Sequence, residues 1–381
     1  MSESKRIAVA HPNLRDKGGG EGVCMTILET LQKKHDVTLL TLTHPDFEEV
    51  NNYYNTNVDT SNVNVKTMGT LAPYVHEKSG ERMHVLKNSM ASRLVNKRSN
   101  YFDLIIGTFN EFTCSTRSIQ YIHLPQFRRW MGHDESSHNN SIYKIYDRLC
   151  KEISGFDYEN IRSHTLLANS EWTANVTDQA YGVKPEVVYP PVDTSEFIST
   201  KWNERENGFV TVGRVVPGKN ILRSIEIVKR LNERGHDTHL HVVGPPLDKS
   251  YAKQVTRKAK QTEGVHIEGE VSRKRLVELI STHKYGIHGM DHEHFGMAVG
   301  ELAAGGTIPF VPNGGGQREI VHEREELLYE SADEAVEKID HVLSDPELRR
   351  ELRDQLGDIE ERFGRKRFKR TIRETVEQTL R

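Results

Sequence analysis

The sequence predicts an α/β protein built from two Rossmann-like domains, and three observations lead to this prediction. Short apolar runs of strand length alternate with longer runs of helical periodicity, which is typical of βαβ units on parallel sheets. The alternation stops in the polar segment 190–207, which begins with two prolines, and starts again at Phe209. At 381 residues, the chain is also too long for one ordinary hydrophobic core.

The first half of the chain alternates predicted strands with predicted helices. We expect strands at residues 7–11, 37–42, 104–107, 120–123, 165–168 and 187–189. We expect helices near residues 22–34, 141–160 and 171–181. The first domain is therefore expected to cover residues 1–197.

The second half repeats the pattern. We expect strands at residues 209–212, 239–243, 266–268, 286–288 and 308–311, and helices at 219–234, 250–261, 273–281 and 297–304. The charged tail predicts a final helix near 364–381 that packs back on the first domain, which leaves 198–363 for the second domain. Because ligand loops follow the carboxyl ends of parallel strands, two facing sheets predict a site in an interdomain cleft.

Composition limits the possible classes of function. The net charge of −3 gives no basic footprint for nucleic acid. The three cysteines, Cys24, Cys114 and Cys150, are odd in number and widely spaced, which fits neither a disulfide framework nor a zinc ligand set. No apolar run approaches the ~20 residues of a membrane helix. We therefore expect a cytoplasmic protein, either soluble or peripheral on the cytoplasmic face of a membrane.

Residues 78–98 depart from this balance, because they carry six Lys or Arg against one acid with apolar residues at near-helical spacing. One interpretation is a helix that lies on an anionic membrane surface. The other is a helix whose apolar stripe packs on the first domain and whose charges are solvated. The pattern alone does not separate the two.

The segment GMDHEHFGMAVGELAAGG places Glu293 and Glu301 on either side of a Phe-Gly turn that opens a helix. The first N–H groups of that helix, at Gly296 and Met297, favour a phosphate. One carboxylate is then suited to sugar hydroxyls and the other to ribose hydroxyls. The donor-binding residues expected from this segment are His294, Phe295, Gly296, Met297 and Glu301.

Two further segments are candidates for binding a diphosphate. Three glycines at 18–20 open a helix, so Gly19 and Gly20 are expected to let backbone amides approach a donor, although such glycines also serve turn geometry alone. Arg214 and Lys219 flank a helix start at the end of a strand, where two cations suit a leaving diphosphate. The alternative for these cations is a capping or surface role.

His123 ends an apolar strand and is expected to project toward the cleft, where its imidazole suits the transferring sugar. The alternative is a structural histidine. The sequence also contains a histidine-rich group made of His288, Asp291, His292 and His294. The spacing of these residues is not typical of a metal site, and the chain has no Asp-x-Asp pair. We therefore expect no metal, and no role for most of the nineteen histidines.

Together these segments resemble the retaining glycosyltransferases of family 4, whose two-domain architecture is called GT-B. The segments that carry the resemblance are HPNLRDKGGGEGV, YIHLP, ANSEWTANV, VYPPVD, VGRVVPGKN and EHFGMAVGELAAGGTIPFVPNGGG. They are most similar to family members that add α-1,2-linked mannose to dolichol-linked oligosaccharide from GDP-mannose. The resemblance implies the following roles: Glu293 contacts the donor sugar, Glu301 the ribose, Arg214 and Lys219 the diphosphate, and His123 the reacting centre.

The expected function is therefore a retaining glycosyltransferase that works without a metal. It would move a hexose, with mannose favoured, from a nucleotide diphosphate sugar, with GDP-mannose favoured, to a glycan hydroxyl such as that of a lipid-linked oligosaccharide. No other cofactor is expected. The chain begins almost at once with its first strand, so we expect it to lack the N-terminal membrane anchor of eukaryotic relatives. Two alternatives stay open: a nucleotide-sugar epimerase or hydrolase, and a nucleotide-sugar-binding protein without catalysis.

Overall fold

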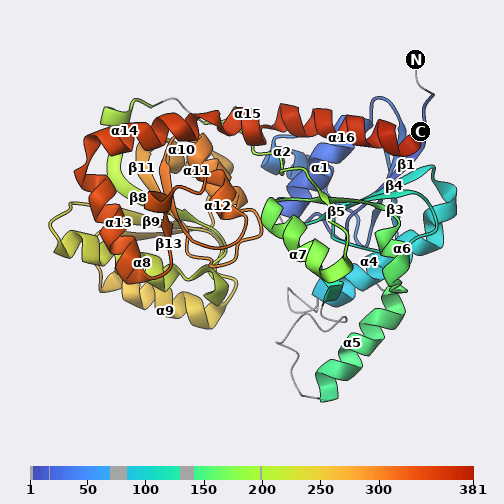
Figure 1. Cartoon of the computed structure of the whole chain (residues 1–381), viewed down its shortest axis with the longest axis horizontal. Coiled ribbons are helices and arrows are strands. Elements are labelled where there is room, and N and C mark those ends of the chain that lie inside the picture. Colours follow the sequence, from blue (N-terminus) through green and yellow to red (C-terminus); the bar gives the residue numbers. More distant parts are fainter. Residues whose placement is uncertain (1–2, 17, 69–83, 129–140, 198–199) are drawn as a thin grey trace. The chain divides into compact units, whose positions relative to one another are not determined.

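A computed structural model describes residues 3–16, 18–68, 84–128, 141–197 and 200–381. The chain divides into two compact units, shown in Figure 1. Unit 1 comprises Met1–Pro191 and Lys366–Arg381, and unit 2 comprises Val192–Arg365.

The limits of the units differ by a few residues from those expected from the sequence, since residues 192–197 and 364–365 belong to unit 2. The cause is local pairing. Val192 forms a parallel β-bridge with Gly364, and its N–H donates to the carbonyl of Phe363 at 2.9 Å.

Unit 1 is built on a parallel sheet of seven strands in the order β3-β2-β1-β4-β5-β6-β7. The strands are β1 (Arg6–Ala10), β2 (Asp36–Thr41), β3 (Val63–Thr67), β4 (Leu104–Gly107), β5 (Ser118–Ile122), β6 (Thr165–Ala168) and β7 (Glu186–Val187). The sequence did not predict β3, whose residues alternate between inner and outer positions at the edge of the sheet and form no continuous apolar run. All strand pairs in the sheet are parallel, as the βαβ pattern predicted.

The helices of unit 1 are α1 (Gly19–Leu31), α2 (Phe47–Tyr54), α4 (His84–Arg98), α5 (Ser141–Ser154), α6 (Tyr158–Arg162), α7 (Glu171–Tyr181) and α16 (Arg365–Leu380). The single helix predicted at 141–160 is two helices. Gly155, with φ of 66°, follows α5 in the left-handed region, and the side chain of Asp157 caps α6.

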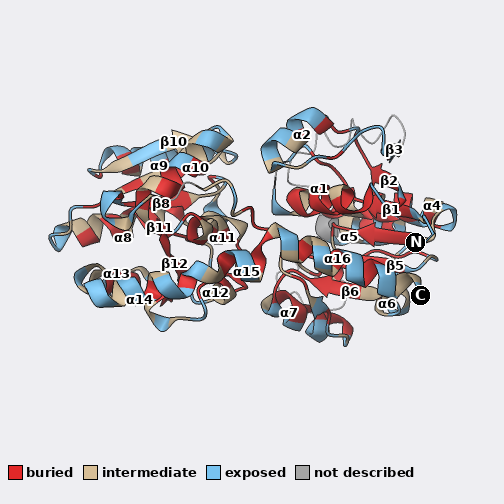
Figure 2. Cartoon of the chain, turned by 90° about the horizontal axis from the view of Figure 1, so that it is seen from above, coloured by how far each residue is buried: buried red, intermediate tan, exposed pale blue. Residues whose placement is uncertain are grey.

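Both faces of the unit 1 sheet are covered. Ile7 and Val9 of β1 belong to the cluster that contains apolar residues of α1 and α16. Ala8 and Ala10, which alternate with them, belong to the cluster that contains residues of α4. This two-sided burial explains why the strands read as continuous apolar runs in the sequence, and Figure 2 shows buried residues along the strands and exposed residues on the helices.

Helix α4 contains the described part of the basic stretch, while residues 78–83 lie outside the described residues. Its apolar residues Val85, Leu94 and Val95 are buried, and the last two pack in the core of unit 1. These side chains therefore cannot insert into a membrane while unit 1 is folded. The packing interpretation of this stretch is the one that the described residues support.

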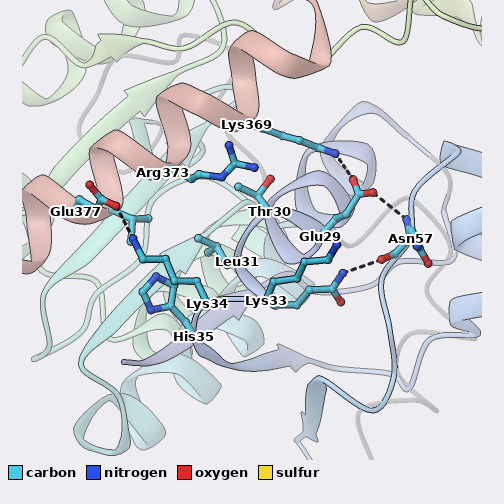
Figure 3. A pocket seen from close by; sticks show the side chains of 12 residues that line it. Glu29, Thr30, Leu31, Lys33, Lys34, His35, Asn57, Lys369, Arg373 and Glu377 are labelled. Carbon is cyan, nitrogen blue, oxygen red and sulfur yellow. Dashed lines mark hydrogen bonds and ion pairs between the residues drawn. The ribbon is translucent and has the colours of Figure 1, made fainter. Parts of the chain in front are cut away.

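Helix α16 closes unit 1 against α1. Its apolar residues Phe368, Ile372 and Val376 belong to the same core cluster as the apolar residues of α1. Two ion pairs flank this contact, Lys369 Nζ to Glu29 Oε2 at 2.5 Å and Lys34 Nζ to Glu377 Oε1 at 2.6 Å, as Figure 3 shows. The charged pocket drawn there is thus lined largely by residues that hold the last helix in place.

Unit 2 is built on a parallel sheet of six strands in the order β10-β9-β8-β11-β12-β13. The strands are β8 (Glu206–Val212), β9 (His239–Val243), β10 (Val265–Gly269), β11 (His283–Ile287), β12 (Ile308–Pro312) and β13 (Leu328–Tyr329). The helices are α8 (Ile221–Glu233), α9 (Lys249–Lys260), α10 (Arg273–Thr282), α11 (Met297–Ala304), α12 (Gln317–Ile320), α13 (Ala332–Ser344), α14 (Pro346–Gln355) and α15 (Ile359–Phe363). No helix in the described part of the chain has the length and apolar character needed to span a membrane.

Candidate functional site

Glu293 lies in the loop between β11 and α11, at the carboxyl end of the strand. Its Oε2 accepts a hydrogen bond from Lys219 Nζ and lies 3.2 Å from His288 Nε2. The side chains of Lys219 and Glu293 are only 18% and 16% exposed. The acid that the sequence predicted to contact the donor sugar is therefore fixed by two basic groups from the loops after neighbouring strands.

The charge state of Glu293 follows from these partners. Burial alone would raise the pKa of this carboxyl, but the hydrogen bond with His288 and the charge of Lys219 outweigh it and lower the pKa well below its usual range. Burial also lowers the pKa of His288. Glu293 is therefore ionised at neutral pH and can accept hydrogen bonds from hydroxyl groups.

Glycines allow the loops around Glu293 to pack backbone against backbone. A Cβ at Gly289 would lie 2.4 Å from the carbonyl oxygen of Lys219. Gly315, with φ of 74°, forms a β-bridge with Glu293, and a Cβ there would lie 2.1 Å from the Glu293 carbonyl oxygen. The glycines at 314 and 315 thus serve the turn and the close backbone packing around Glu293.

A second polar group joins the start of α8 to the loop after β11. Arg223 Nη2 bonds to Asp291 Oδ1 at 2.6 Å, and Asn220 Nδ2 donates to the carbonyl of Gly289 at 3.0 Å. Asn220 also bonds to Asp291 Oδ2 at 3.2 Å. These contacts hold the Lys219 turn against the loop that carries Glu293. His288 and Asp291, for which the sequence predicted no metal, therefore bond within the protein: His288 to Glu293, and Asp291 to Arg223 and Asn220.

The two cations predicted to hold the diphosphate follow β8 in different surroundings. Lys219 belongs to the charged cluster with Glu293, and its aliphatic stem lies 3.5 Å from the position of a Cβ at Gly213. Arg214 directly follows Gly213 and is exposed. The structure thus brings Lys219 and Glu293 together and places Arg214 on the surface of the same turn.

Helix α11 begins at the position predicted from the sequence. Gly296, with φ of 102°, precedes its first residue Met297. The first N–H groups of a helix lack partners within the helix, so this end suits an anion. Phe295 is 2% exposed and its ring packs edge-on against Phe363, with centroids 5.4 Å apart. Its side chain is therefore a core residue, and only its backbone can face a ligand; His294, just before it, is half-buried.

Glu301 lies on α11 and is held by an arginine. Its Oε1 accepts a hydrogen bond from Arg273 Nη1 at 2.7 Å, and Arg273 Nε donates to Glu196 Oε2 at 2.8 Å. The Glu301 side chain is 17% exposed. A ribose that binds this carboxylate would share it with Arg273, a residue that the sequence analysis did not single out.

In unit 1 the glycine turn starts α1, with Gly18 as its N-cap. The Oε2 atom of Glu21 accepts a hydrogen bond from the N–H of Gly18 at 3.0 Å, which is the glutamate half of a capping box, since Gly18 has no side chain to supply the other half. A Cβ at Gly20 would lie 3.2 Å from His123 Nε2. The structure therefore brings His123 to the glycine turn, as expected if both face one ligand.

Two residues beside this turn were missed by the sequence analysis. His11 Nδ1 lies 2.8 Å from Thr108 Oγ1, and His11 Nε2 lies 3.5 Å from Glu21 Oε1. Burial would raise the pKa of Glu21, but its hydrogen bond with His11 contributes to a net lowering. His11 ends the first predicted strand and Glu21 follows the glycines, so both lay within the quoted motif, but their contact depends on the turn between them.

The position of His123 is set by the backbone around it. Asn110, with φ of 80°, accepts hydrogen bonds at its Oδ1 from the N–H groups of His123 at 2.7 Å and Leu124 at 3.0 Å. His123 Nε2 lies 3.2 Å from the carbonyl oxygen of Thr108, and since a carbonyl only accepts, this nitrogen carries the proton. Nδ1 is then the nitrogen that can accept a proton or a hydrogen bond.

Comparison with known families gives a match within unit 2. Residues 192–356 match the family described as glycosyl transferases group 1. The matched range contains the loops after β8 and β11, and so it contains Arg214, Lys219, Glu293 and Glu301.

Several curated relatives share one name, GDP-Man:Man(3)GlcNAc(2)-PP-Dol alpha-1,2-mannosyltransferase. The protein from Dictyostelium discoideum is 27% identical over 266 residues, which cover 63% of this chain and 52% of that protein. The human protein is 29% identical over 238 residues, which cover 56% and 48%. The Xenopus tropicalis protein is 24% identical over 415 residues, which cover 95% and 85%. The chain thus spans about half the length of the first two relatives in these matches.

Solved glycosyltransferase structures share the fold over nearly the whole chain. The Anabaena protein HepE in complex with UDP and glucose has a TM-score of 0.68 at 14% identity, covering 98% of this chain and 100% of that one. WaaG, a glycosyltransferase involved in lipopolysaccharide biosynthesis, has a TM-score of 0.67 at 15% identity, covering 92% and 94%. The prediction of two parallel-sheet domains of the GT-B class is confirmed.

Proposed function

We propose that this chain, whose residues 192–356 form a group 1 glycosyl transferase domain, is a retaining glycosyltransferase that moves a hexose from a nucleotide diphosphate sugar to a glycan hydroxyl. Mannose and GDP-mannose are the proposed sugar and donor, because several relatives are named for that transfer. The observation that carries the proposal is the ionised Glu293, held by Lys219 and His288 at the carboxyl ends of β8 and β11. That edge of a parallel sheet is where ligands bind.

In the proposed donor complex, each charged group of unit 2 binds a different part of the nucleotide sugar. Glu293 accepts hydrogen bonds from sugar hydroxyls, and Glu301 accepts them from the ribose. Lys219 has more than one N–H to donate, so it can hold Glu293 and a phosphate oxygen together. Arg214 and the N–H groups of Gly296 and Met297, at the start of α11, complete the diphosphate site.

Catalysis in this proposal is mainly electrostatic. Negative charge grows on the diphosphate as the bond to the sugar breaks, and Arg214, Lys219 and the α11 N-terminus stabilise it. His123 of unit 1 is proposed to bond the transferring sugar through its ring, next to Gly19 and Gly20. Because the family retains anomeric configuration, the acceptor hydroxyl attacks from the side that the diphosphate leaves.

The acceptor is proposed to be a glycan, and a lipid-linked oligosaccharide is the specific candidate, since the relatives are named for transfer to one. Unit 1 is proposed to bind it. We also propose that the protein acts at the cytoplasmic face of a membrane, where it would meet a lipid-linked acceptor. Because Leu94 and Val95 pack in the core of unit 1, contact of α4 with anionic lipid would rest mainly on its exposed charges, Arg93 and Lys97.

The experiment that tests the function is transfer from a panel of nucleotide sugars to glycan acceptors, with the anomeric configuration of the product read by NMR. We expect turnover with GDP-mannose and an α-linked product. Glu293→Gln and Arg214→Ala should each lose most of the activity, whereas Lys229→Ala, which removes an exposed cation paired with Glu233 on α8, should not. Equal activity in the wild type and both site variants would refute the site.

The same assays separate the two competing functions. An epimerase or hydrolase would convert the donor without acceptor, which NMR of the donor alone would show. A binding protein would bind GDP-mannose in calorimetry and turn over no donor with any acceptor. Absence of affinity for every nucleoside diphosphate and nucleotide sugar would remove all three functions.

A further inference from the structure

Three histidines of unit 2 gather at the edge of the sheet opposite to the proposed donor site. His239 and His283 are the first residues of β9 and β11, and His241 lies two residues further along β9. Lys219 and Glu293, by contrast, follow the carboxyl ends of β8 and β11. The histidine cluster therefore plays no direct part in the proposed transfer reaction.

The three rings lie close enough to share one ion. One ring nitrogen from each of His239, His241 and His283 lies within 4.8 Å of the other two. The Nε2 atoms of His239 and His283 are 3.0 Å apart. Tetrahedral zinc, with Zn–N distances of about 2.0–2.1 Å, needs nitrogens roughly 3.4 Å apart, so small side-chain rotations would complete this geometry.

A glycine makes the cluster possible. Strands β9 and β11 are not neighbours, because β8 runs between them. Gly208 of β8 pairs with His239, and a Cβ on Gly208 would lie only 2.3 Å from His239 Nε2. The imidazole of His239 thus crosses β8 over the space that any other residue at 208 would fill, and so reaches His283.

The hydrogen bonds behind two of the rings direct ligand nitrogens into the cluster. His283 Nδ1 lies 2.7 Å from the carbonyl oxygen of Leu279, so Nδ1 carries the proton and Nε2 presents its lone pair. His241 Nδ1 lies 2.7 Å from Glu268 Oε1, which orients that ring in the same way. A carboxylate or a carbonyl behind each imidazole is the usual support of metal-binding histidines.

A nearby acid also fits a cation. Glu206, the first residue of β8, places its Oε2 atom 3.5 Å from His239 Nε2 and 3.9 Å from His283 Nε2. Its carboxylate is available as a fourth ligand and would offset the charge of the ion.

We propose that His239, His241 and His283, with Glu206 as the fourth ligand, bind one divalent transition metal ion, with zinc as the expected ion. Three imidazoles and one carboxylate suit zinc or its neighbours and not Mg²⁺ or Ca²⁺, which prefer oxygen ligands. The ion would link β8, β9 and β11 at their amino ends. Its role would be to stabilise the donor domain.

The first test measures metal binding by the full, tag-free chain after removal of metals with a chelator. We expect one equivalent of Zn²⁺ to be retained through gel filtration, and Co²⁺ to give the visible absorption bands of a tetrahedral site. The temperature of unfolding should rise with Zn²⁺ and not with Mg²⁺. Less than a stoichiometric amount of bound Zn²⁺ in the wild type would overturn the proposal, whatever the variants do.

Two variants locate the ion. His239→Gln removes a ligand, and Gly208→Ala keeps every ligand but places a methyl group where the His239 ring lies. Each should lower zinc affinity by more than about tenfold, because the loss of a group that only supports a ligand already costs about 10- to 100-fold. His236→Gln is the matched control, because that histidine bonds to Asp340 at 2.6 Å outside the cluster, and it should bind zinc as the wild type does.

The outcomes are separable from those of the proposed function. Wild-type zinc affinity in both His239→Gln and Gly208→Ala would place the ion elsewhere and refute the site. Binding of GDP-mannose by the metal-free protein tests the donor site independently, since no residue is shared. The two assays would therefore distinguish a glycosyltransferase that lacks this metal site from a zinc-binding protein that does not bind the donor.

Discussion

Two buried glutamates of this chain, Glu293 in unit 2 and Glu111 in unit 1, show how neighbours decide the charge of one residue type. Glu293 accepts from Lys219 and lies beside His288, and its pKa is lowered despite burial. Glu111 is fully buried and bonds to neutral groups, the Phe127 N–H at 2.6 Å and the Tyr181 hydroxyl at 2.7 Å. Burial raises its pKa to about 7.

The difference concerns what each site is built for. The structure keeps Glu293 ionised between the Lys219 ammonium and the His288 ring, an arrangement that suits a ligand with hydroxyl groups and phosphates. The Glu111 carboxylate instead accepts hydrogen bonds from neutral groups and joins the loop before β5 to α7. A buried acid is therefore a candidate functional residue when a cation from another loop is directed at it.

The largest expected effect comes from removing that cation. Lys219→Ala should lower kcat/KM for GDP-mannose by about 10²–10³-fold, because it deletes a donor to the leaving diphosphate. It also leaves Glu293 with one basic partner, at a cost of about 1–3 kcal/mol in folding free energy. Steady-state kinetics and thermal unfolding measure the two effects.

A double variant isolates the effect of Lys219 on stability. In Lys219→Ala/Glu293→Gln the uncompensated charge is gone, so stability should recover, while activity stays low because Glu293→Gln alone loses most of it. Recovery of activity as well would mean that the donor needs neither Lys219 nor the charge of Glu293.

The next effect concerns Glu301, an acid held by Arg273. Glu301→Gln should raise the KM for the donor roughly 10- to 150-fold, the value of a hydrogen bond to a charged group. Donors with 2′-deoxy- or 3′-deoxyribose test the contact directly, because the substitution should cost little with the donor that lacks the bonded hydroxyl. An equal loss with both deoxy donors would show that Glu301 acts through Arg273 and not on the ribose.

Glu111→Gln tests whether burial raises the pKa of Glu111, the second acid of the comparison. Since the folded-state pKa of about 7 exceeds the ordinary value of 4.5, the folded protein holds its proton more tightly, and stability falls as pH rises from 4.5 to 7. Glutamine preserves the acceptor oxygen and does not ionise, so about 1–3 kcal/mol of this pH dependence should disappear. Unfolding of both proteins at pH 5 and pH 8 gives the result; identical pH dependence would mean that Glu111 titrates normally.

The sequence predicted those elements best whose ends carry local signals. Helix α7 has its predicted limits, Glu171–Tyr181, because Ser170 caps its start and Gly182 ends it in the left-handed region. Helix α11 was also predicted at Met297–Ala304. The short edge strand β13 was missed, since two residues give no periodicity to read.

The sequence identified the loops that form the site but not all of the side-chain contacts within it. Glycines, acids and cations after strands identified Lys219 and Glu293, which the parallel sheet then brings together. Arg273 was missed because it begins a helix and reaches Glu301 only after that helix packs. The histidine cluster was missed for a similar reason, since its members lie on two strands, β9 and β11, and meet over a glycine of β8 between them.

The smallest expected effect tests whether the glycine turn of unit 1 binds the diphosphate, as the helix start of unit 2 is proposed to do. At α1 the carboxylate of Glu21 already bonds to the Gly18 N–H, so a phosphate near Gly19 and Gly20 meets a negative charge. Glu21→Gln keeps the capping geometry and removes that charge. If the diphosphate reaches this turn, GDP-mannose should bind about 2–5-fold more tightly, an effect of about 0.3–1 kcal/mol for a charge at a helix end.

Calorimetry measures this gain in affinity at low and at high salt. The gain should be smaller at high salt, because salt screens the charge of Glu21. Lys219→Ala must change the affinity in the opposite direction in the same titration. An unchanged affinity in Glu21→Gln would show that Gly19 and Gly20 do not bind the donor. The turn would then serve α1 and the placement of His123 alone, and the phosphates would be bound by the cations after β8 and the start of α11.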